Sequence, residues 1–319
     1  MSRKVLSRDG FVRCCGVVNE YTCERVRNRT IAQLRRLKLN PMYHLHRFGL
    51  YERREWGGIV KAPLRRHAFP ILHKNGDSDK ELMNAIRQVA RTYVDTVGNR
   101  NAALVELSAM IAYPGTKSQR RHMDIAADIE DVYGYPPLVT CWLALQDVKC
   151  LGDGPTICVP ESHIRFRDRA KRIRSQQAEI STAHRETGDM IKRTYDMEGN
   201  LVLEEDPFLL RTETKMRSRD ETDTSREIRD FGEEKNGVPI LMNVGDVTMM
   251  DCRVSHYGSE MDSSKSEPRV LLNLSFASMR QNETYETCLN RMLELGFTAH
   301  IHPDVCSEQI TARDLLVSE

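Results

Sequence analysis

The stretch ALVELSAMIAYPG, residues 103–115, decides the fold, because a largely apolar run that ends at a Pro-Gly turn indicates a buried β-strand. His122 and Asp124 follow shortly after this turn and stand two positions apart. Successive side chains of a strand point to opposite faces, so residues at i and i+2 project together. A histidine and a carboxylate placed in this way can bind one metal ion.

The spacing by itself is weak evidence for a metal site. With 10 His and 46 acidic residues among 319, a random order gives about 1.4 histidines that have an acid two positions on. Three such pairs are present: His122/Asp124, His184/Glu186 and His302/Asp304. His184 lies in a charged stretch typical of a solvated face, and no later histidine could complete a set with His302. The strand before His122 therefore favours the first pair.

A second histidine, His256, would complete the ligand set. It follows the strand-like run 246–252, which begins at a Gly-Asp turn. Because 134 residues separate it from His122, the two must meet through a long-range contact, which a closed barrel supplies. Two histidines and one carboxylate leave three metal positions open, which suits non-haem Fe(II). The alternative is a surface histidine in a turn.

Arg269 begins a strand with two different faces. Over 269–276 one face is wholly apolar, whereas Arg269 shares the other face with an asparagine and a serine. A buried arginine needs an anionic partner, and a guanidinium group matches a carboxylate in bidentate geometry. Arg269 is therefore a candidate anchor for an anion. The alternatives are a strand-edge arginine in water, a pair with Glu267 or Asp251, or a different anchor, Arg253 or Arg280.

Composition limits the partners and the compartment. The net charge of +1 creates no field that would recruit nucleic acid or a membrane. Local basic clusters at 25–38, 65–66 and 165–174 are typical of solvated helix faces, or could guide an anionic small molecule. Nine Cys without a CxxC pair indicate free thiols in a reducing compartment. With neither a signal-like apolar segment nor an 18-residue apolar run, the expected location is the cytoplasm.

The apolar pattern predicts helices first and strands later. A short strand within 7–18, helices at 19–39 and 78–97, and an irregular segment at 41–76 are expected. The expected core strands are 103–113, 138–145, 154–160, 238–242, 246–252 and 269–276. A charged insert at about 164–236, with a helix at 164–184, would be a lid or loosely ordered, and a helical tail would cover about 284–319. A single α+β domain with a β-barrel or sandwich core accounts for this order.

In the segments that contain these candidate metal and anion-binding residues, and in several others, the chain resembles the phytanoyl-CoA dioxygenase family of Fe(II)/2-oxoglutarate-dependent oxygenases. Two positions depart from the family pattern: Glu161 stands where glycine is usual, and Asp262 stands near a usual asparagine. Residues 40–76 and 165–236 carry no resemblance. The segments that carry it are Asp9–Val12, Pro114–Thr116, Gln119, His122–Asp124, Trp142–Asp147, Asp153–Gly154, Pro160–His163, and Gly245–His256 with Arg269.

The resemblance implies a double-stranded β-helix (a jelly-roll, cupin-like core) with flanking N-terminal helices. It implies that His122, Asp124 and His256 bind Fe(II) and that Arg269 anchors the far carboxylate of 2-oxoglutarate. Beside this co-substrate it places Trp142, Gln119 and Ser259, although a plain core role fits Trp142 equally. The implied reaction uses O2 and forms succinate and CO2 while a small molecule is hydroxylated or otherwise oxidised. The presence of a carboxylate ligand at position 124 disfavours halogenation.

Two other functions stay open from the sequence alone. The first is a non-catalytic jelly-roll module that binds or regulates, which the charged insert and the basic clusters favour. The second is a cupin-type metalloenzyme that does not use 2-oxoglutarate. A non-catalytic module would not bind 2-oxoglutarate together with a metal ion. A cupin-type metalloenzyme of the second kind would not need Arg269 for activity.

Overall fold

The computed structural model describes residues 2–38, 66–70, 80–119, 121–125, 129–165, 168, 193–195, 201–203, 237–295, 297 and 310–317. The chain forms two compact units, one of residues 1–165 with 238–319 and one of residues 166–237. In the second unit, strands β6 (Arg193–Tyr195) and β7 (Leu201–Leu203) form an antiparallel pair that the sequence did not predict. The predicted role of this insert as a lid stays a prediction.

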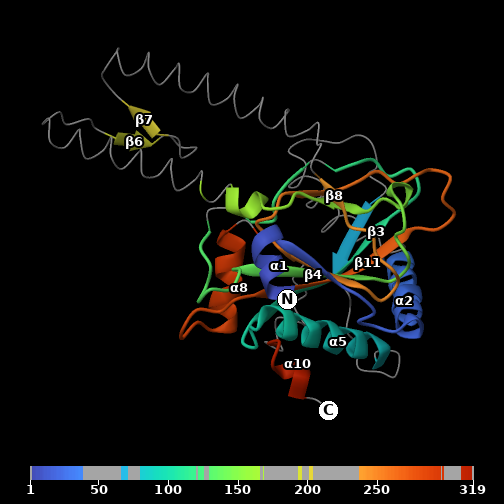
Figure 1. Ribbon diagram of the computed structural model, residues 1–319, viewed down its shortest axis with the longest axis horizontal. Helices are drawn as coiled ribbons and strands as arrows, with labels where there is room; N and C mark the ends of the chain where they lie inside the picture. Colours follow the sequence, from blue (N-terminus) through green and yellow to red (C-terminus); the bar gives the residue numbers. More distant parts are fainter. Residues whose placement is uncertain are drawn as a thin grey trace, which may run out of the picture. The chain divides into compact units, whose positions relative to one another are not determined.

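The described residues of the first unit form two antiparallel sheets (Figure 1). The smaller sheet has the order β10-β5-β8, with bounds His256–Gly258, Thr156–Cys158 and Val238–Pro239. From β4 to β11 the chain passes repeatedly between the sheets, which is the jelly-roll arrangement that the family resemblance implied. The larger sheet has the order β1-β9-β4-β11-β3-β2, with bounds Phe11–Cys14, Val247–Asp251, Leu138–Ala144, Arg269–Ala277, Ala103–Ala112 and Arg66–Pro70.

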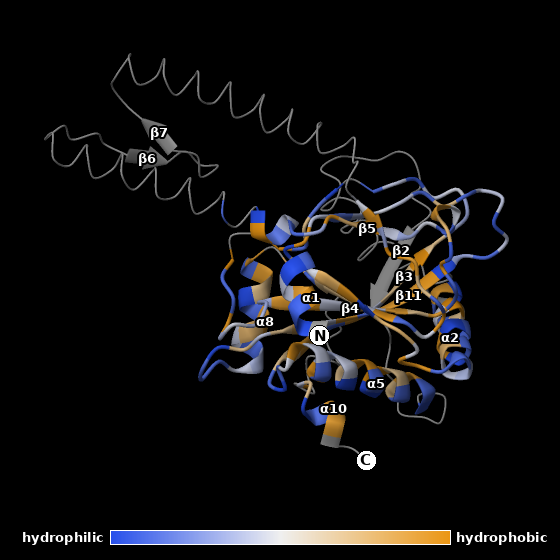
Figure 2. Ribbon diagram, in the orientation of Figure 1, coloured by the Kyte–Doolittle hydropathy of each residue, from blue (hydrophilic) through white to orange (hydrophobic). Residues whose placement is uncertain are grey.

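Helix α5 (Lys80–Val97) covers the outer face of the larger sheet (Figure 2). Its apolar residues at helical spacing are buried, as predicted, and pack in one cluster with the apolar face of β11. Tyr93 stacks on Phe276 with ring centroids 4.4 Å apart. Leu271, on the opposite face of β11, belongs to a different cluster together with Trp142, so the predicted two-faced strand is confirmed. The inner face of the sheet is therefore free to carry polar groups.

The remaining helices flank this core. Helix α2 (Glu20–Lys38) begins as predicted, because the Asn19 side chain accepts a hydrogen bond from the backbone N–H of Thr22 at 2.8 Å. Helices α8 (Tyr285–Glu294) and α10 (Asp314–Val317) both lie within the predicted helical tail at about 284–319. None of the described helices combines the length and the apolarity needed to cross a bilayer.

Two local predictions were wrong. The strand expected within 7–18 is limited to β1, because residues 2–9 form helix α1 (Ser2–Asp9). Part of the segment expected to be irregular, 41–76, forms the edge strand β2, where a proline is tolerated because only one side is paired. His256, which the sequence places after the strand-like run 246–252, begins strand β10 and does not lie in the turn that was the alternative. The first two residues of the predicted helix 78–97 and most of 164–184 lie outside the described residues.

The turn at Glu161 keeps the shape that glycine would favour. Glu161 has a φ of 62°, in the left-handed region that residues with a side chain rarely adopt. Its backbone N–H donates to Asp9 at 3.1 Å, and its carbonyl accepts from Ile164 and Arg165. The glutamate thus adopts, in spite of its side chain, a left-handed conformation that glycine adopts without strain.

Candidate active site

An antiparallel bridge joins the two distant histidines. The backbone N–H of His122 donates to the His256 carbonyl at 2.9 Å, and the reverse bond measures 2.8 Å. Asp124 is held in turn by its own N–H, which donates to the Cys252 carbonyl at 3.0 Å. The sequence predicted that His122 and Asp124 lie on one regular strand. This was wrong, because His122 makes an isolated bridge and Asp124 lies in a bend. These backbone bonds nevertheless bring the three side chains together.

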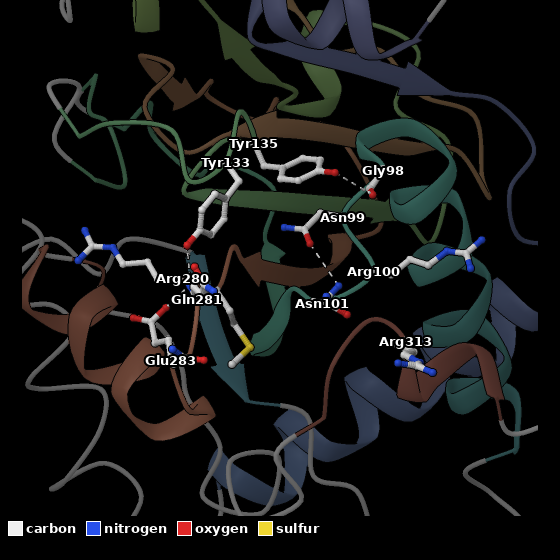
Figure 3. Close-up of a pocket in the computed structure, with 12 residues that line it drawn as sticks. Gly98, Asn99, Arg100, Asn101, Tyr133, Tyr135, Arg280, Gln281, Glu283 and Arg313 are labelled. Carbon is white, nitrogen blue, oxygen red and sulfur yellow. Dashed lines mark hydrogen bonds between the residues drawn. The ribbon is translucent and has the colours of Figure 1, made fainter.

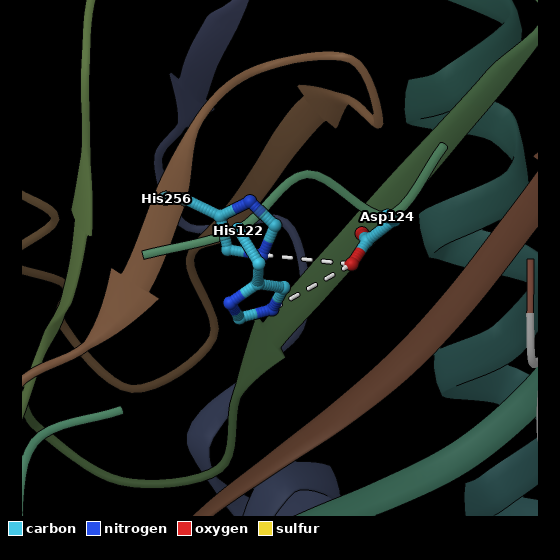
Figure 4. Close-up of side chains that lie close together, drawn as sticks. All are labelled: His122, Asp124 and His256. Carbon is cyan, nitrogen blue, oxygen red and sulfur yellow. Dashed lines mark ion pairs between the residues drawn. The ribbon is translucent and has the colours of Figure 1, made fainter. Parts of the chain in front are cut away.

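The side chains of His122, Asp124 and His256 form one cluster (Figure 4). Their potential ligand atoms all lie within 4.8 Å of one another. The Oδ1 atom of Asp124 is 3.9 Å from Nε2 of His122 and 3.7 Å from Nε2 of His256. The His256 side chain is 7% exposed and that of His122 is 34% exposed, so one side of the cluster is accessible to a ligand.

The environment of His256 favours the neutral imidazole that a metal ion requires. Burial lowers the pKa of His256, Asp124 acts in the opposite direction, and His122 lowers the pKa further. Its Nδ1 atom lies 3.0 Å from the Val254 carbonyl, to which the protonated Nδ1–H can donate. This bond leaves Nε2 unprotonated and close to Asp124. Two imidazoles and one carboxylate are a donor set that fits Fe(II).

Arg269 lies in the interior at the start of β11, where it is 2% exposed. Its Nη1 atom donates to the carbonyl of Gly154 at 2.5 Å. The two acidic residues considered as alternative partners have other contacts: Glu267 pairs with Arg27, and Asp251 pairs with Arg253. A buried guanidinium group in the barrel is chemically suited to a carboxylate ligand.

The other two candidate arginines are less suitable anchors. Arg253 is buried, and its guanidinium group bonds to Asp251 and Asp131 at 2.6 and 2.7 Å, so its charge is compensated within the protein. Arg280 is exposed and lines a separate cavity. Among the arginines that the sequence proposed, Arg269 therefore remains the candidate anchor.

Trp142 lies on the inner face of β4 and is 3% exposed. Its ring centroid is 5.8 Å from that of His256, so the indole forms part of the wall next to the cluster. Gln119 and Ser259 bond to backbone close to His256. The Gln119 side chain accepts from the N–H of Gly258 at 2.8 Å, and the Ser259 hydroxyl donates to the Pro155 carbonyl at 2.7 Å. These bonds fix the segment that follows the second histidine.

The remaining histidines that the sequence considered lie elsewhere. His163 contacts the carbonyl of Ser7 through Nε2 at 3.2 Å and packs under Gly10, which is a structural role. His184 and His302 lie outside the described residues.

A separate cavity of about 850 Å³ lies between the end of α5 and the segment after β11 (Figure 3). Asparagine, arginine and tyrosine side chains line it, and none of the cluster residues does. Figure 3 shows Arg100 and Arg280 directed to opposite sides, so their charges do not converge on one ligand. The cavity is therefore not the site defined by His122, Asp124 and His256.

A jelly roll with a 2-His-1-carboxylate cluster and a buried arginine defines the class of non-haem iron, 2-oxoglutarate-dependent enzymes. The sequence profile of the family described as phytanoyl-CoA dioxygenase (PhyH) matches residues 6–270. The chain therefore belongs to the phytanoyl-CoA dioxygenase family, and it is an oxidoreductase that uses Fe(II), 2-oxoglutarate and O2. No curated protein sequence matches the chain.

Solved structures with related folds were also found. The epimerase SnoN from nogalamycin biosynthesis has 17% identity and a TM-score of 0.47, with 87% of this chain and 81% of that chain covered. HygX from Streptomyces hygroscopicus with nickel, 2-oxoglutarate and hygromycin B bound has 14% identity and a TM-score of 0.49. That comparison covers 96% of this chain and 98% of HygX.

Proposed function

We propose that the protein oxidises a small-molecule substrate, by hydroxylation or a related reaction, with conversion of 2-oxoglutarate to succinate and CO2. The observation that carries the proposal is the meeting of His122, Asp124 and His256, which lie far apart in the sequence, within 4.8 Å. Membership of the phytanoyl-CoA dioxygenase family supports the same chemistry. The identity of the substrate is left open; the basic helix α2 favours an anionic one.

Each residue has a distinct part in this proposal. His122, Asp124 and His256 would hold the metal ion, and Arg269 would hold the far carboxylate of 2-oxoglutarate. When bound, the metal and co-substrate supply the oxidising chemistry. Trp142 closes the inner wall beside His256, which keeps bulk water away from the ligands. Gln119 and Ser259 keep the backbone after His256 in place through their bonds to Gly258 and Pro155.

Alanine substitution of each proposed ligand tests the assignment. We expect His122→Ala, Asp124→Ala and His256→Ala to bind Mn(II) at least about tenfold more weakly, because each removes a direct ligand. Succinate formation from 2-oxoglutarate and Fe(II) should be lost in the same variants. Calorimetric titration and a succinate assay measure the two effects. Asp262→Ala, which changes an exposed carboxylate, is the control. Unchanged Mn(II) affinity in His256→Ala would show that the cluster is not the metal site.

A further inference from the structure

A buried acidic residue lies on the inner face of the barrel, outside the proposed ligand set. Glu106 in β3 is 7% exposed and stands opposite Ser275 of β11 in the sheet. Each of its carboxylate oxygens accepts a hydroxyl hydrogen, one from Ser108 at 2.7 Å and one from Ser275 at 2.6 Å. The carboxylate is thus kept in the interior by hydrogen bonds on both oxygens, although neither the sequence nor the proposed reaction assigns it a role.

The contacts of Ser275 continue across the sheet. The Ser275 hydroxyl lies 2.8 Å from the hydroxyl of Thr140 in β4, and that hydroxyl lies 3.1 Å from the thiol of Cys252. All three residues are at most 3% exposed. The Glu106 chain, defined as Glu106, Ser275, Thr140 and Cys252, therefore connects β3, β11 and β4 with the residue that follows β9.

The hydrogens in this chain have one consistent direction. A hydroxyl group has a single hydrogen, and that of Ser275 is donated to Glu106, so Ser275 can only accept from Thr140. The hydrogen of Thr140 is then used as well, so Thr140 accepts from the Cys252 thiol. Burial, Asp124, Asp251 and Glu106 all raise the pKa of Cys252, against the opposing effect of its bond to Thr140, which agrees with a protonated thiol that donates. The carboxylate therefore orients every donor up to Cys252.

Cys252 also holds the backbone of Asp124 by a hydrogen bond. The Cys252 carbonyl accepts hydrogen bonds from the N–H groups of Asp124 and Ile125 at 3.0 and 3.3 Å, and its own N–H donates to Leu138 at 3.1 Å. A rotation of Cys252 would therefore move the backbone that carries the Asp124 carboxylate. The side-chain bond to Thr140 resists such a rotation, because it fixes the residue at a third point.

We propose that Glu106 is a positioning residue for the metal centre, and that its hydrogen-bond chain through Ser275, Thr140 and Cys252 holds the backbone of Asp124 in place. The inference rests on the proposed function, because it takes Asp124 to be a metal ligand. Groups that orient the ligands of a metal ion commonly change its affinity by about 10- to 100-fold when they are removed. Because this chain acts through the backbone, the lower end of that range is expected.

Two isosteric substitutions on adjacent strands provide the test. Thr140→Val interrupts the chain and leaves both hydroxyl donors of Glu106 intact. Thr248→Val in β9 is the matched control: Thr248 is also buried, faces Trp142 across the sheet, and its hydroxyl has no hydrogen-bond partner among the described residues. We expect Thr140→Val to weaken Mn(II) binding about tenfold in calorimetry and Thr248→Val to change it less than about twofold.

The rise in Tm caused by saturating Mn(II) separates positioning from general stability. A purely structural role would lower the Tm of the metal-free protein and leave this rise unchanged, whereas positioning reduces the rise in Thr140→Val. If Thr140→Val does not fold, Cys252→Ala and Cys252→Ser replace it. Serine keeps a donor for Thr140, so it should retain Mn(II) affinity that alanine loses.

Two results would overturn the inference: equal Mn(II) affinities of Thr140→Val and Thr248→Val, or, where the second pair is used, equal affinities of Cys252→Ala and Cys252→Ser. A failure of the proposed function is distinguishable, because wild-type protein and His256→Ala would then bind Mn(II) equally well.

Discussion

At the scale of single residues, Arg269 is the side chain that we propose as the anchor for the far carboxylate of 2-oxoglutarate. It begins strand β11 and is almost fully buried. The enclosed position strengthens its interaction with a carboxylate, because little water competes for the charge. The sequence predicted this residue from the alternation of β11, since the apolar face of that strand could be read directly.

Arg269→Ala should raise the KM for 2-oxoglutarate by roughly 30-fold or more, because truncation of one partner of a buried charge pair costs about 2–5 kcal/mol. The Mn(II) affinity should stay near that of the wild type, since none of the three cluster residues changes. Arg269→Lys keeps the positive charge but lacks the planar guanidinium group. Its KM for 2-oxoglutarate should lie between that of the wild type and that of Arg269→Ala. Steady-state succinate assays at varied 2-oxoglutarate measure the effect. An unchanged KM would instead support a metalloenzyme in which 2-oxoglutarate does not use this arginine.

The candidate ligand residues could be identified from the sequence, whereas the residues that we propose to support them could not. His122, Asp124 and His256 stand out by residue type, spacing and the strands that precede them. Glu106 and Thr140 gave no such signal, because each lies inside an ordinary strand and acquires its role only from side chains on neighbouring strands. Contacts of this kind depend on the register of the sheet, which a single sequence does not specify.

At the scale of elements, the turn after β5 is the clearest departure from an ideal backbone. The left-handed conformation of Glu161 costs roughly 1–2 kcal/mol for a residue with a side chain. Its ion pair with Arg165 is exposed and contributes little in return. This turn also holds α1, through the bond from the Glu161 N–H to the Asp9 carbonyl.

Glu161→Gly should stabilise the protein. Glycine adopts this φ without strain, and the gain is partly offset by its larger entropy in the unfolded chain, so we expect about 0.5–1 kcal/mol in the free energy of unfolding. Urea denaturation measures the change as a higher midpoint at an unchanged m-value. Glu161→Ala loses the same ion pair but keeps the strain, and it should show no gain. A lower midpoint for the glycine variant would mean that the side chain of Glu161 stabilises the turn.

Strands that are buried on both faces were predictable from the sequence, whereas edge strand β2 and helix α1 were missed. Strands β3, β4, β9 and β11 carry long apolar runs, because both of their faces are covered. Edge strand β2 contains a proline and two basic residues, which argue against a strand unless its single partner is known. Helix α1 is too short to show a convincing helical period.

At the scale of the whole molecule, the candidate site belongs entirely to the unit formed by residues 1–165 and 238–319. The unit of residues 166–237 interrupts this one in sequence without supplying any of the three cluster residues. The pairing of Cys158 with Val238 shows that the chain returns to the smaller sheet directly after the insert.

Replacement of 166–237 by a short Gly-Ser linker should leave the candidate metal site intact. We expect the Mn(II) affinity to stay within about threefold of the wild type, because the backbone bonds that join the ligands all lie in the retained unit. If the insert serves as a lid, as the sequence predicts, substrate-dependent succinate formation should fall while metal affinity is kept. A folded variant that no longer binds Mn(II) would show that the insert is required for the site itself.

The bridge between His122 and His256 also fixes when the site can form during biosynthesis. The first histidine leaves the ribosome together with β3, but its partner is made 134 residues later, after the whole insert. At typical translation rates this interval lasts about 7–27 s. During this time the nascent chain has His122 and Asp124 but lacks His256, so the proposed set of three ligands is incomplete. The candidate site can therefore assemble only after His256 has been made and its backbone has paired with that of His122.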